Sequence, residues 1–365
     1  MRQLIFRSTN IDVFAVECTG SDTVIVTFDA FSDAFSQERQ GFGEAYFKKI
    51  GVTAYHFIHK HNLWYNFPEM AEALVLVKSR ISAGQSIVTY GASMGGYAAY
   101  RSSGLLDARK VIVFSPQYSV DPNLVPWENR WRETTKNCTH FMDSLTINTR
   151  SEIYLFYDPG TNDARHAELI SQYGSCLHIP VPYSGHYSIA MLQQIGLLDS
   201  TIRNIIYGDF DVSTLQKEIF ANSDKSAHFL LNKAKALPYS AKRQRLALLY
   251  KAAALCESEP EYELFLGKIL VDYGLWNEAK EAYHRGWKKK PDSHLGLLSY
   301  LGFLNLCERY AEGLIIFDMI RAQAPDFADA VGLKIEKFDQ YPFGRNRFLR
   351  GLRSVRGLFS TISIR

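Results

Sequence analysis

The sequence has no apolar run of the roughly 18 residues that a membrane-spanning helix requires, so we expect no helix to cross a membrane. The first residues, MRQLIFRSTNIDVF, contain neither a long apolar core nor a small-residue cleavage site, and a standard secretory signal is therefore not expected. An excess of one charge is also lacking, because 41 lysines and arginines nearly balance 38 aspartates and glutamates. The net charge of +3 gives no reason to expect a nucleic-acid partner.

Cysteine is scarce and scattered. The five cysteines are Cys18, Cys138, Cys176, Cys256 and Cys307. No two of them form a C-x-x-C pair, which argues against a disulfide framework and against a zinc site. This usage favours reduced thiols in a cytoplasm.

The first part of the chain alternates short β-rich runs with longer helical ones. The strands are expected at 13–18, 23–28, 53–58, 86–90, 110–114, 151–157 and 177–181. The helices are expected at 43–50, 70–81, 95–103, 164–172 and 189–197. Several of the strand runs are almost continuously apolar, as in strands that are buried on both faces. We therefore predict an α/β domain over residues 1–207, with a mostly parallel sheet sandwiched by helices.

After residue 207 the strand signals end, and residues 208–342 read as helices with short breaks. One window of 34 residues begins at Pro260 and reads PEYELFLGKILVDYGLWNEAKEAYHRGWKKKPDS. Its residues Leu266, Gly267, Tyr273, Gly274, Ala279, Tyr283 and Pro291 occupy signature positions of the tetratricopeptide repeat. The next unit follows the pattern less closely. Gly313 stands at the position that corresponds to Ala279, and Gly302 stands one residue after the position that corresponds to Gly267. An earlier helical pair is expected at about 227–256.

The second part therefore resembles tetratricopeptide repeats, which implies an all-α domain of stacked antiparallel helix pairs. Two roles stay open for it. The repeats either present a concave surface to a protein partner, or they only pack against the first domain.

The motif Gly91-x-Ser93-x-Gly95 follows a predicted strand and precedes a predicted helix, in the letters VTYGASMGGY. Such a turn forces the serine into a strained conformation and exposes its hydroxyl above the sheet, while the two glycines leave room for neighbouring elements. The N-terminus of the following helix favours negative charge that develops at the site. These features predict that Ser93 is a nucleophile.

A serine hydroxyl needs a base to take its proton. His186, in VPYSGHYS, follows the last predicted strand, and Gly185 lets the imidazole reach over the serine. The acid that orients this histidine should follow the strand at 151–157. Asp163 is the preferred candidate because it lies shortly before the next predicted helix, and Asp158, at the strand end, is the alternative acid.

On these motifs, residues 10–205 resemble an α/β-hydrolase. The resemblance implies acyl transfer to water or to another acceptor through an acyl-serine, without a cofactor. The chain departs from the family pattern at Phe28-Asp29, where the family has a His-Gly pair. We expect the backbone amide of Ala30 or Phe31 to form one half of the oxyanion hole and the amide of Met94 to form the other. Asp29 is expected to point away and hold the loop.

Two further segments are candidates for lining the substrate site. Asn62, Trp64 and Tyr65 follow a strand end on the same side of the sheet, where they either line the site or anchor a loop with buried aromatic rings. The segment 117–142 is where this fold often inserts a lid. In it, Arg130 or Arg132 either meets an acidic substrate group or forms a surface ion pair.

The tail, residues 343–365, carries six arginines and no acid. Its apolar residues recur at near-helical spacing, which is typical of a basic amphipathic helix on an anionic membrane surface. The alternatives are a tail that docks on the repeats and a disordered tail. The cysteine usage and the lack of a secretory signal predict a cytoplasmic localisation, and the tail predicts peripheral contact at the inner membrane surface.

Taken together, the sequence predicts a serine hydrolase that cleaves an ester or thioester of a small-molecule or carrier-linked acyl substrate, with a protein partner at its helical repeats. One alternative is an acyltransferase with the same three residues. The other is an inactive hydrolase fold that serves as a scaffold, which the altered Phe28-Asp29 stretch favours and the complete set of serine, acid and histidine opposes.

Overall fold

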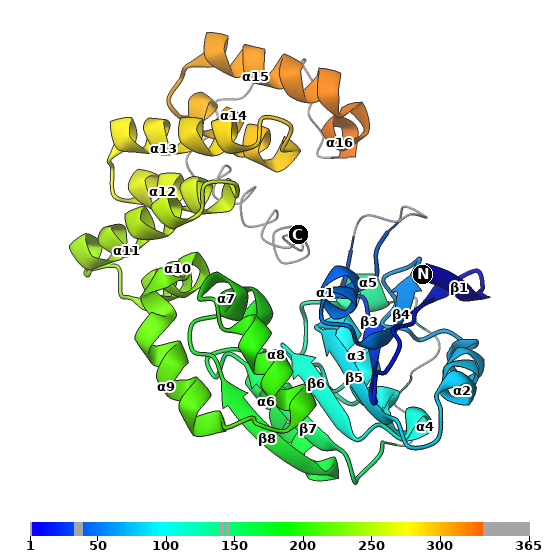
Figure 1. The fold of residues 1–365 in the computed structure, drawn as a ribbon. Coiled ribbons are helices and arrows are strands. Elements are labelled where there is room, and N and C mark those ends of the chain that lie inside the picture. Colours follow the sequence, from blue (N-terminus) through cyan, green and yellow to red (C-terminus); the bar gives the residue numbers. More distant parts are fainter. Residues whose placement is uncertain (1, 33–38, 137, 139–141, 143–146, 331–365) are drawn as a thin grey trace. The chain divides into compact units, whose positions relative to one another are not determined.

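The computed structural model describes residues 2–32, 39–136, 138, 142 and 147–330, in two compact units (Figure 1). The first unit ends at Ser223 and the second begins at Asp224. The domain boundaries at residues 207 and 342 stay predictions, and the tail at 343–365 lies outside the described residues. Among the described residues, no helix is both long enough and apolar enough to cross a membrane.

The first unit is built on one sheet of eight strands in the order β1-β2-β4-β3-β5-β6-β7-β8. The strands are β1 (Arg2–Arg7), β2 (Ile11–Val16), β3 (Thr23–Phe28), β4 (Thr53–His59), β5 (Ser86–Ala92), β6 (Lys110–Phe114), β7 (Glu152–Tyr157) and β8 (Ser175–Pro180). Strand β2 runs antiparallel to both of its neighbours, β1 and β4. All other neighbouring strands of the sheet, in the order β4-β3-β5-β6-β7-β8, pair in parallel. The carboxyl ends of β3, β5, β6, β7 and β8 therefore meet at one edge of the sheet.

Helices cover both faces of this sheet (Figure 1). They are α1 (Glu44–Lys49), α2 (Met70–Arg80), α3 (Met94–Arg101), α4 (Ser103–Leu106), α5 (Arg132–Thr135), α6 (Asn162–Ile170), α7 (Ser188–Gln194), α8 (Leu198–Tyr207) and α9 (Val212–Asn222). Val24, Val26 and Phe28 of β3 belong to one buried cluster with residues of α2, α3 and α6. On the opposite face, the ring of Tyr90 in β5 meets Phe47 of α1, with centroids 5.3 Å apart. Alternation along the strands puts these two sets on opposite sides.

The structure differs from the sequence-based prediction at several elements, among them β1, β2 and the helix at 95–103. Strand β1 was not predicted, because it is an edge strand with half-exposed side chains and gives no continuous apolar run. Strand β2 begins at Ile11 and ends at Val16, two residues earlier at each end than the predicted 13–18. The helix predicted at 95–103 ends at Arg101, and the short helix α4 follows it.

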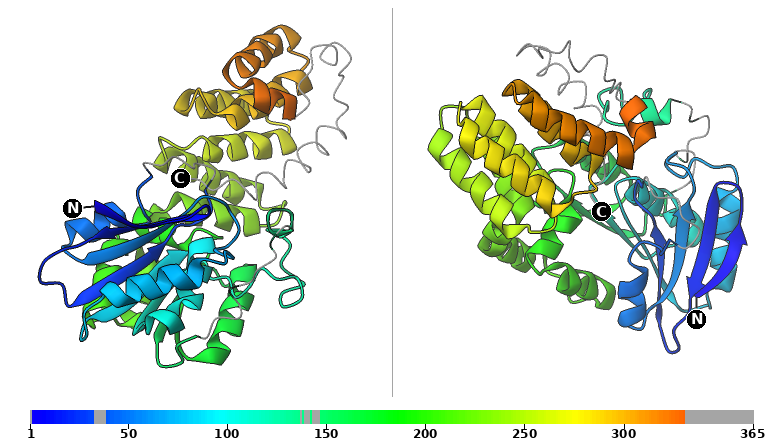
Figure 2. Two further views of the ribbon diagram at one scale, coloured as in Figure 1. Left: turned by 90° about the vertical axis from the view of Figure 1, so that its right-hand side faces the viewer. Right: turned by 90° about the horizontal axis from the view of Figure 1, so that it is seen from above.

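The second unit consists of helices that stack in antiparallel pairs (Figure 2). The pairs are α10 (Ala227–Ala236) with α11 (Lys242–Leu255), α12 (Glu261–Asp272) with α13 (Trp276–Lys289), and α14 (His294–Leu306) with α15 (Tyr310–Gln323), followed by α16 (Pro325–Ala330). Gly267 allows α12 and α13 to cross closely, since a Cβ there would lie 2.9 Å from the ring of Tyr283. The predicted fold class is confirmed: a mostly parallel α/β sheet sandwiched by helices, of the α/β-hydrolase type, followed by an all-α repeat domain.

Candidate active site

Ser93 lies at the turn between β5 and α3. Its backbone is strained, with φ of 52° and ψ of −118°, and its amide donates to the carbonyl of Phe114 in the neighbouring strand at 2.9 Å. A Cβ at Gly91 would lie 2.2 Å from the carbonyl oxygen of Gly95. A Cβ at Gly95 would lie 2.1 Å from that of Phe28. Both glycines are therefore needed for the sharp reversal, as the G-x-S-x-G motif predicts.

Three side chains from three separate segments of the chain form a series of hydrogen bonds. His186 Nε2 lies 2.8 Å from Ser93 Oγ, and His186 Nδ1 lies 2.7 Å from Asp163 Oδ2. A carboxylate can only accept, so Nδ1 carries a proton that it donates to Asp163, and in the neutral ring Nε2 is left to accept from the serine. The structure thus brings together the residues that the sequence put forward as nucleophile, base and acid.

Asp163 is fully buried, whereas the side chain of His186 keeps 20% of its surface exposed. Burial by itself would raise the pKa of Asp163, but the charge and hydrogen bond of His186, and then those of Arg130, lower that pKa below its usual value. The carboxylate is therefore held ionised. It lies in the first turn of α6 and not in the loop before it, because Thr161 caps the helix and starts it earlier than predicted.

Asp158, the alternative acid, takes a different position. Its Oδ2 accepts from the backbone amide of Gly185 at 2.8 Å, and its Oδ1 accepts from the amide of Gly160 at 2.9 Å. Gly185 has a positive φ of 62°, so the turn before the histidine is itself constrained. In this structure, the carboxylate of Asp158 fixes the loop that carries His186.

Two serines that no sequence motif indicated also hold this loop. Ser115, after β6, donates to the carbonyl of His186 at 3.0 Å, and its Oγ lies 3.1 Å from Ser188 Oγ. Ser188 in turn donates to the carbonyl of Phe156. Small hydroxyl side chains of this kind are common in turns, and only the packed strands show that these two contact the histidine loop.

The segment that carries Ala30 lies against the start of α3. A Cβ on Gly95 would come within 2.9 Å of the carbonyl oxygens of both Phe28 and Asp29, which shows how closely the two backbones approach. The carbonyl of Ala30 accepts from His59 Nε2 at 2.9 Å. Met94 is the first residue of α3, where backbone amides have no partner within the helix. The role of these two amides in an oxyanion hole stays a prediction.

Asp29 is held within its own loop. Its carboxylate accepts from the amide of Phe42 at 2.8 Å and pairs with Arg39 at 2.9 Å. Burial raises the pKa of Asp29 to about 7, against the charge and hydrogen bonds of Arg39 and the amide of Phe42. These contacts describe a carboxyl that organises the loop between β3 and α1.

Of the three residues put forward for substrate contact, two have no exposed surface. Trp64 and Tyr65 are both 0% exposed. The hydroxyl of Tyr65 donates to the carbonyl of Asp29 at 3.0 Å, and the indole of Trp64 donates to Gln117. Asn62 bonds both the amide and the carbonyl of Ser32. The alternative of a loop anchored by buried aromatic rings describes these contacts, and a role in substrate binding stays a prediction.

The segment between β6 and β7 contributes directly to the site. Trp131 is almost fully buried, and its ring centroid lies 5.8 Å from that of His186 and 5.9 Å from that of Phe31. Arg130 donates from Nη1 to Asp163 Oδ1 at 2.8 Å. The ion pair weighed for Arg130 from the sequence is not a surface pair, since its partner is the fully buried acid of the site. Contact of Arg130 with an acidic substrate group stays a prediction.

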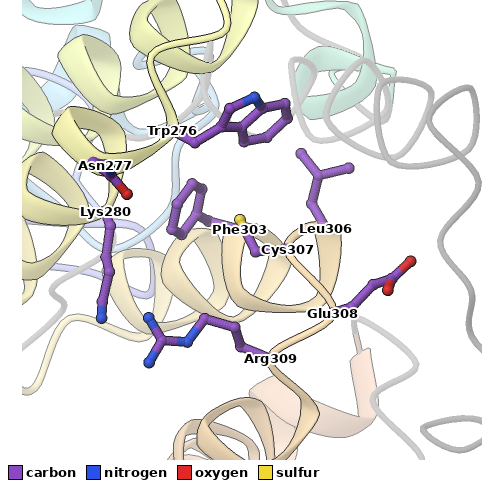
Figure 3. A pocket seen from close by; sticks show the side chains of 8 residues that line it. All are labelled: Trp276, Asn277, Lys280, Phe303, Leu306, Cys307, Glu308 and Arg309. Carbon is purple, nitrogen blue, oxygen red and sulfur yellow. The ribbon is translucent and has the colours of Figure 1, made fainter.

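A separate hollow lies in the helical unit, between α13 and the end of α14 (Figure 3). It has a volume of about 390 Å³. Trp276, Phe303 and Leu306 supply its apolar wall, and Lys280 and Arg309 supply cations at its lower edge (Figure 3).

In the described part of the chain, no group of three or more histidine, cysteine, aspartate or glutamate side chains is arranged to hold a metal ion.

No protein-family profile matches this chain, and no curated protein sequence matches it. Among solved structures, the capsule O-acetyltransferase of Neisseria meningitidis serogroup A is 13% identical, with 55% of this chain and 93% of that chain covered and a TM-score of 0.41. Est1E from Butyrivibrio proteoclasticus is 12% identical, with 56% and 99% covered and a TM-score of 0.38. YrrB, a TPR protein with an unusual peptide-binding site, is 15% identical, with 46% and 86% covered and a TM-score of 0.29. Likenesses this distant carry no conclusion about the activity of this chain.

Proposed function

We propose that the chain is a serine hydrolase that acts on an ester or thioester through an acyl-serine intermediate. The observation that carries this proposal is the continuous hydrogen-bonded chain from Ser93 through His186 to Asp163, with Ser93 in a strained strand-to-helix turn. A serine that only stabilised the turn would not need both ring nitrogens of a histidine and a buried carboxylate aligned behind it.

In the proposed reaction, Ser93 Oγ attacks the carbonyl carbon of the substrate while its proton passes to His186 Nε2. Asp163 accepts the Nδ1 hydrogen bond and stabilises the imidazolium that forms. The amides of Met94 and Ala30 stabilise the negative oxygen of the tetrahedral intermediate. The intermediate collapses by breaking the bond to the leaving oxygen or sulfur, which takes the proton from Nε2. Water or an alcohol then attacks the acyl-serine by the same steps and restores the hydroxyl.

Labelling with a fluorophosphonate probe, read by intact mass, tests this function. The wild-type chain should gain one adduct, and Ser93→Ala and His186→Ala should gain none at the same exposure. Ser79→Ala removes an exposed serine of α2 and should label like the wild type. A well-folded wild type without an adduct, or an adduct that persists in Ser93→Ala, would leave the inactive scaffold as the better description.

The acceptor of the acyl group distinguishes a hydrolase from an acyltransferase. Nothing in the three-residue chain selects water over an alcohol, because either one attacks the acyl-serine with His186 as base. Product analysis of a p-nitrophenyl ester with and without a competing alcohol separates the two. The ester of the added alcohol as main product would favour the acyltransferase, and the free acid would favour the hydrolase.

We also propose that the helical unit binds a protein partner. The hollow between α13 and α14 supports this proposal, since its volume of about 390 Å³ is within the range of ligand pockets and its wall combines aromatic rings with cations. Binding of a peptide library by the full chain, compared with Trp276→Ala, tests the proposal, and equal binding by both would exclude the hollow as the binding site.

We further propose that the chain works in a reducing cytoplasm. The five free thiols support this localisation.

A further inference from the structure

Behind the triad lies a second set of charged side chains that the reaction above does not use. Arg130 Nη1 donates to Asp163 Oδ1 at 2.8 Å and lies 3.3 Å from His186 Nδ1. The same guanidinium donates from Nη2 to Glu128 Oε2 at 2.6 Å, and its Nε lies 3.0 Å from both oxygens of Glu128. Arg130 therefore joins two carboxylates, and the two oxygens of Asp163 have separate partners.

The far end of this set is fixed by His166. Its Nδ1 accepts from the backbone amide of Tyr118 at 3.0 Å, so in the neutral ring the proton sits on Nε2, which donates to Glu128 Oε2 at 3.1 Å. His166 is 0% exposed and Glu128 is 4% exposed. Burial by itself would raise the pKa of Glu128, but the hydrogen bond from His166 and then the hydrogen bond and charge of Arg130 hold that pKa well below its usual value.

The charges in this set alternate. Asp163 and Glu128 are anions, and Arg130 is the cation between them. The guanidinium of Arg130 thus compensates the charge of both buried carboxylates and holds them at fixed positions. The bond from Arg130 also prevents the carboxylate of Asp163 from rotating away from the histidine.

Other charged groups face the histidine loop and the network from the neighbouring elements. Asp158, after β7, bonds the amide of Gly185. Arg165 of α6 is exposed and lies 4.0 Å over the ring of Trp127, which packs on His166. Arg132 is exposed, and its guanidinium bonds the backbone carbonyls of Pro126 and Glu128. Arg130 is the cation of these that bonds Asp163 directly.

We propose that Arg130 is a positioning residue of the site: it fixes the orientation of Asp163 toward His186, while Glu128 and His166 hold Arg130 in place. This inference rests on the proposed function, since it assigns a role with respect to the same serine and histidine. It predicts that loss of the arginine slows the reaction of Ser93, although Ser93, His186 and Asp163 are all retained.

The test is the second-order rate constant of fluorophosphonate labelling, measured at one fixed pH. Arg130→Met should lower this rate constant by roughly 10- to 100-fold, because Asp163 is no longer held toward His186. Arg130→Lys keeps the charge but loses the planar guanidinium that bonds both carboxylates, so its rate constant should lie between those of Arg130→Met and the wild type.

Arg132→Met is the matched control. It removes the same charge from the same segment without touching a carboxylate of the network, and it should leave the rate constant within about twofold of the wild type. An equal fall in Arg132→Met, or an unchanged rate constant in Arg130→Met, would overturn the inference.

A second readout separates this inference from the proposed function. The NMR signal of the His186 Nδ1 proton, assigned by its loss in His186→Ala, reports the hydrogen bond to Asp163 whether or not the chain is active. A changed chemical shift of this proton in Arg130→Met, on a chain that does not label, would support the positioning role and reject the hydrolase. Labelling of Ser93 with an unchanged signal and an unchanged rate constant in Arg130→Met would reject the role of Arg130 and keep the hydrolase.

Discussion

Ser93 adopts a backbone conformation that few residues other than glycine adopt, and its neighbours explain how the chain accommodates it. A Cβ on Gly95 would meet the carbonyl oxygens of Phe28 and Asp29, which belong to a central strand and the loop after it. Backbone atoms of a sheet cannot move aside as the end of a flexible side chain can. Position 95 therefore tolerates no side chain, however small.

Gly95→Ala should destabilise the chain by about 3 kcal/mol or more, since the added methyl group overpacks against backbone atoms. It should also abolish labelling of Ser93. Urea denaturation followed by circular dichroism measures the first effect and intact mass the second. Gly174→Ala is the control, because a Cβ there would lie 3.5 Å or more from its neighbours. Equal stability of Gly95→Ala and the wild type would contradict the close approach of α3 to the strand.

At the scale of elements, the crossing of α12 and α13 shows how a repeat packs. Gly267 in α12 faces the ring of Tyr283 in α13, and that ring stacks on Phe303 of α14 with centroids 4.9 Å apart. The buried carboxylate of Glu263 in α12 pairs with Arg285 of α13 at 3.0 Å. A small residue on one helix thus places a large ring where the next helix can contact it.

Gly267→Ala should lower the free energy of unfolding by roughly 1 kcal/mol. The methyl group would lie 2.9 Å from the ring carbons of Tyr283, and the overpacking of about 1–3 kcal/mol exceeds the gain of about 1 kcal/mol in helix propensity. Gly296→Ala, in α14, gains the same propensity with ordinary contacts and should be neutral or stabilising. Urea denaturation of both variants compares the two effects, and a stabilised Gly267→Ala would show that the helices can separate without penalty.

For the whole molecule, buried histidines predict how stability depends on pH. Burial lowers the pKa of His56 and His59 in the first unit, and of His228 in the second, to about 4. His56 is 0% exposed and bonds Thr27 through Nδ1, and its buried Nε2 has no hydrogen-bond partner among the described residues. A proton added at that nitrogen would have no acceptor within the described part of the folded chain.

Because the folded pKa lies below the unfolded value of about 6.5, the unfolded chain binds more protons between these two values. The free energy of unfolding should therefore fall as the pH is lowered from about 6.5 to 4, by roughly 3 kcal/mol for each fully buried histidine. Urea denaturation at several pH values measures this slope, which His56→Gln should reduce. His61→Gln, at an exposed position, is the control. A slope that is the same in His56→Gln and the wild type would show that this imidazole is not the group that titrates.

Much of the first unit follows from short stretches of the sequence. Gly91 and Ser93 predict the turn because backbone sterics within a few residues decide it, and seven strands follow from apolar runs. The need for a glycine at position 95 comes instead from the distant residues Phe28 and Asp29. Strand β1 could not be found in this way, since half-exposed edge residues give no such run. The hydroxyls of Ser115 and Ser188 carry no signal of their own, because their partners come from distant strands.

Residue type and spacing determined Ser93 and His186 and narrowed the acid to Asp163 or Asp158, because each member of the candidate triad needs a particular chemistry at the end of a particular strand. The tertiary structure alone decided which acid meets His186 and what Arg130 does. Asp163 and Asp158 both follow β7, and only the path of α6 turns Asp163 toward the imidazole. Arg130 lies 33 residues from Asp163 and 56 from His186 in the sequence. A charge pair at that separation is set by the packing of whole segments, and local backbone preferences do not encode it.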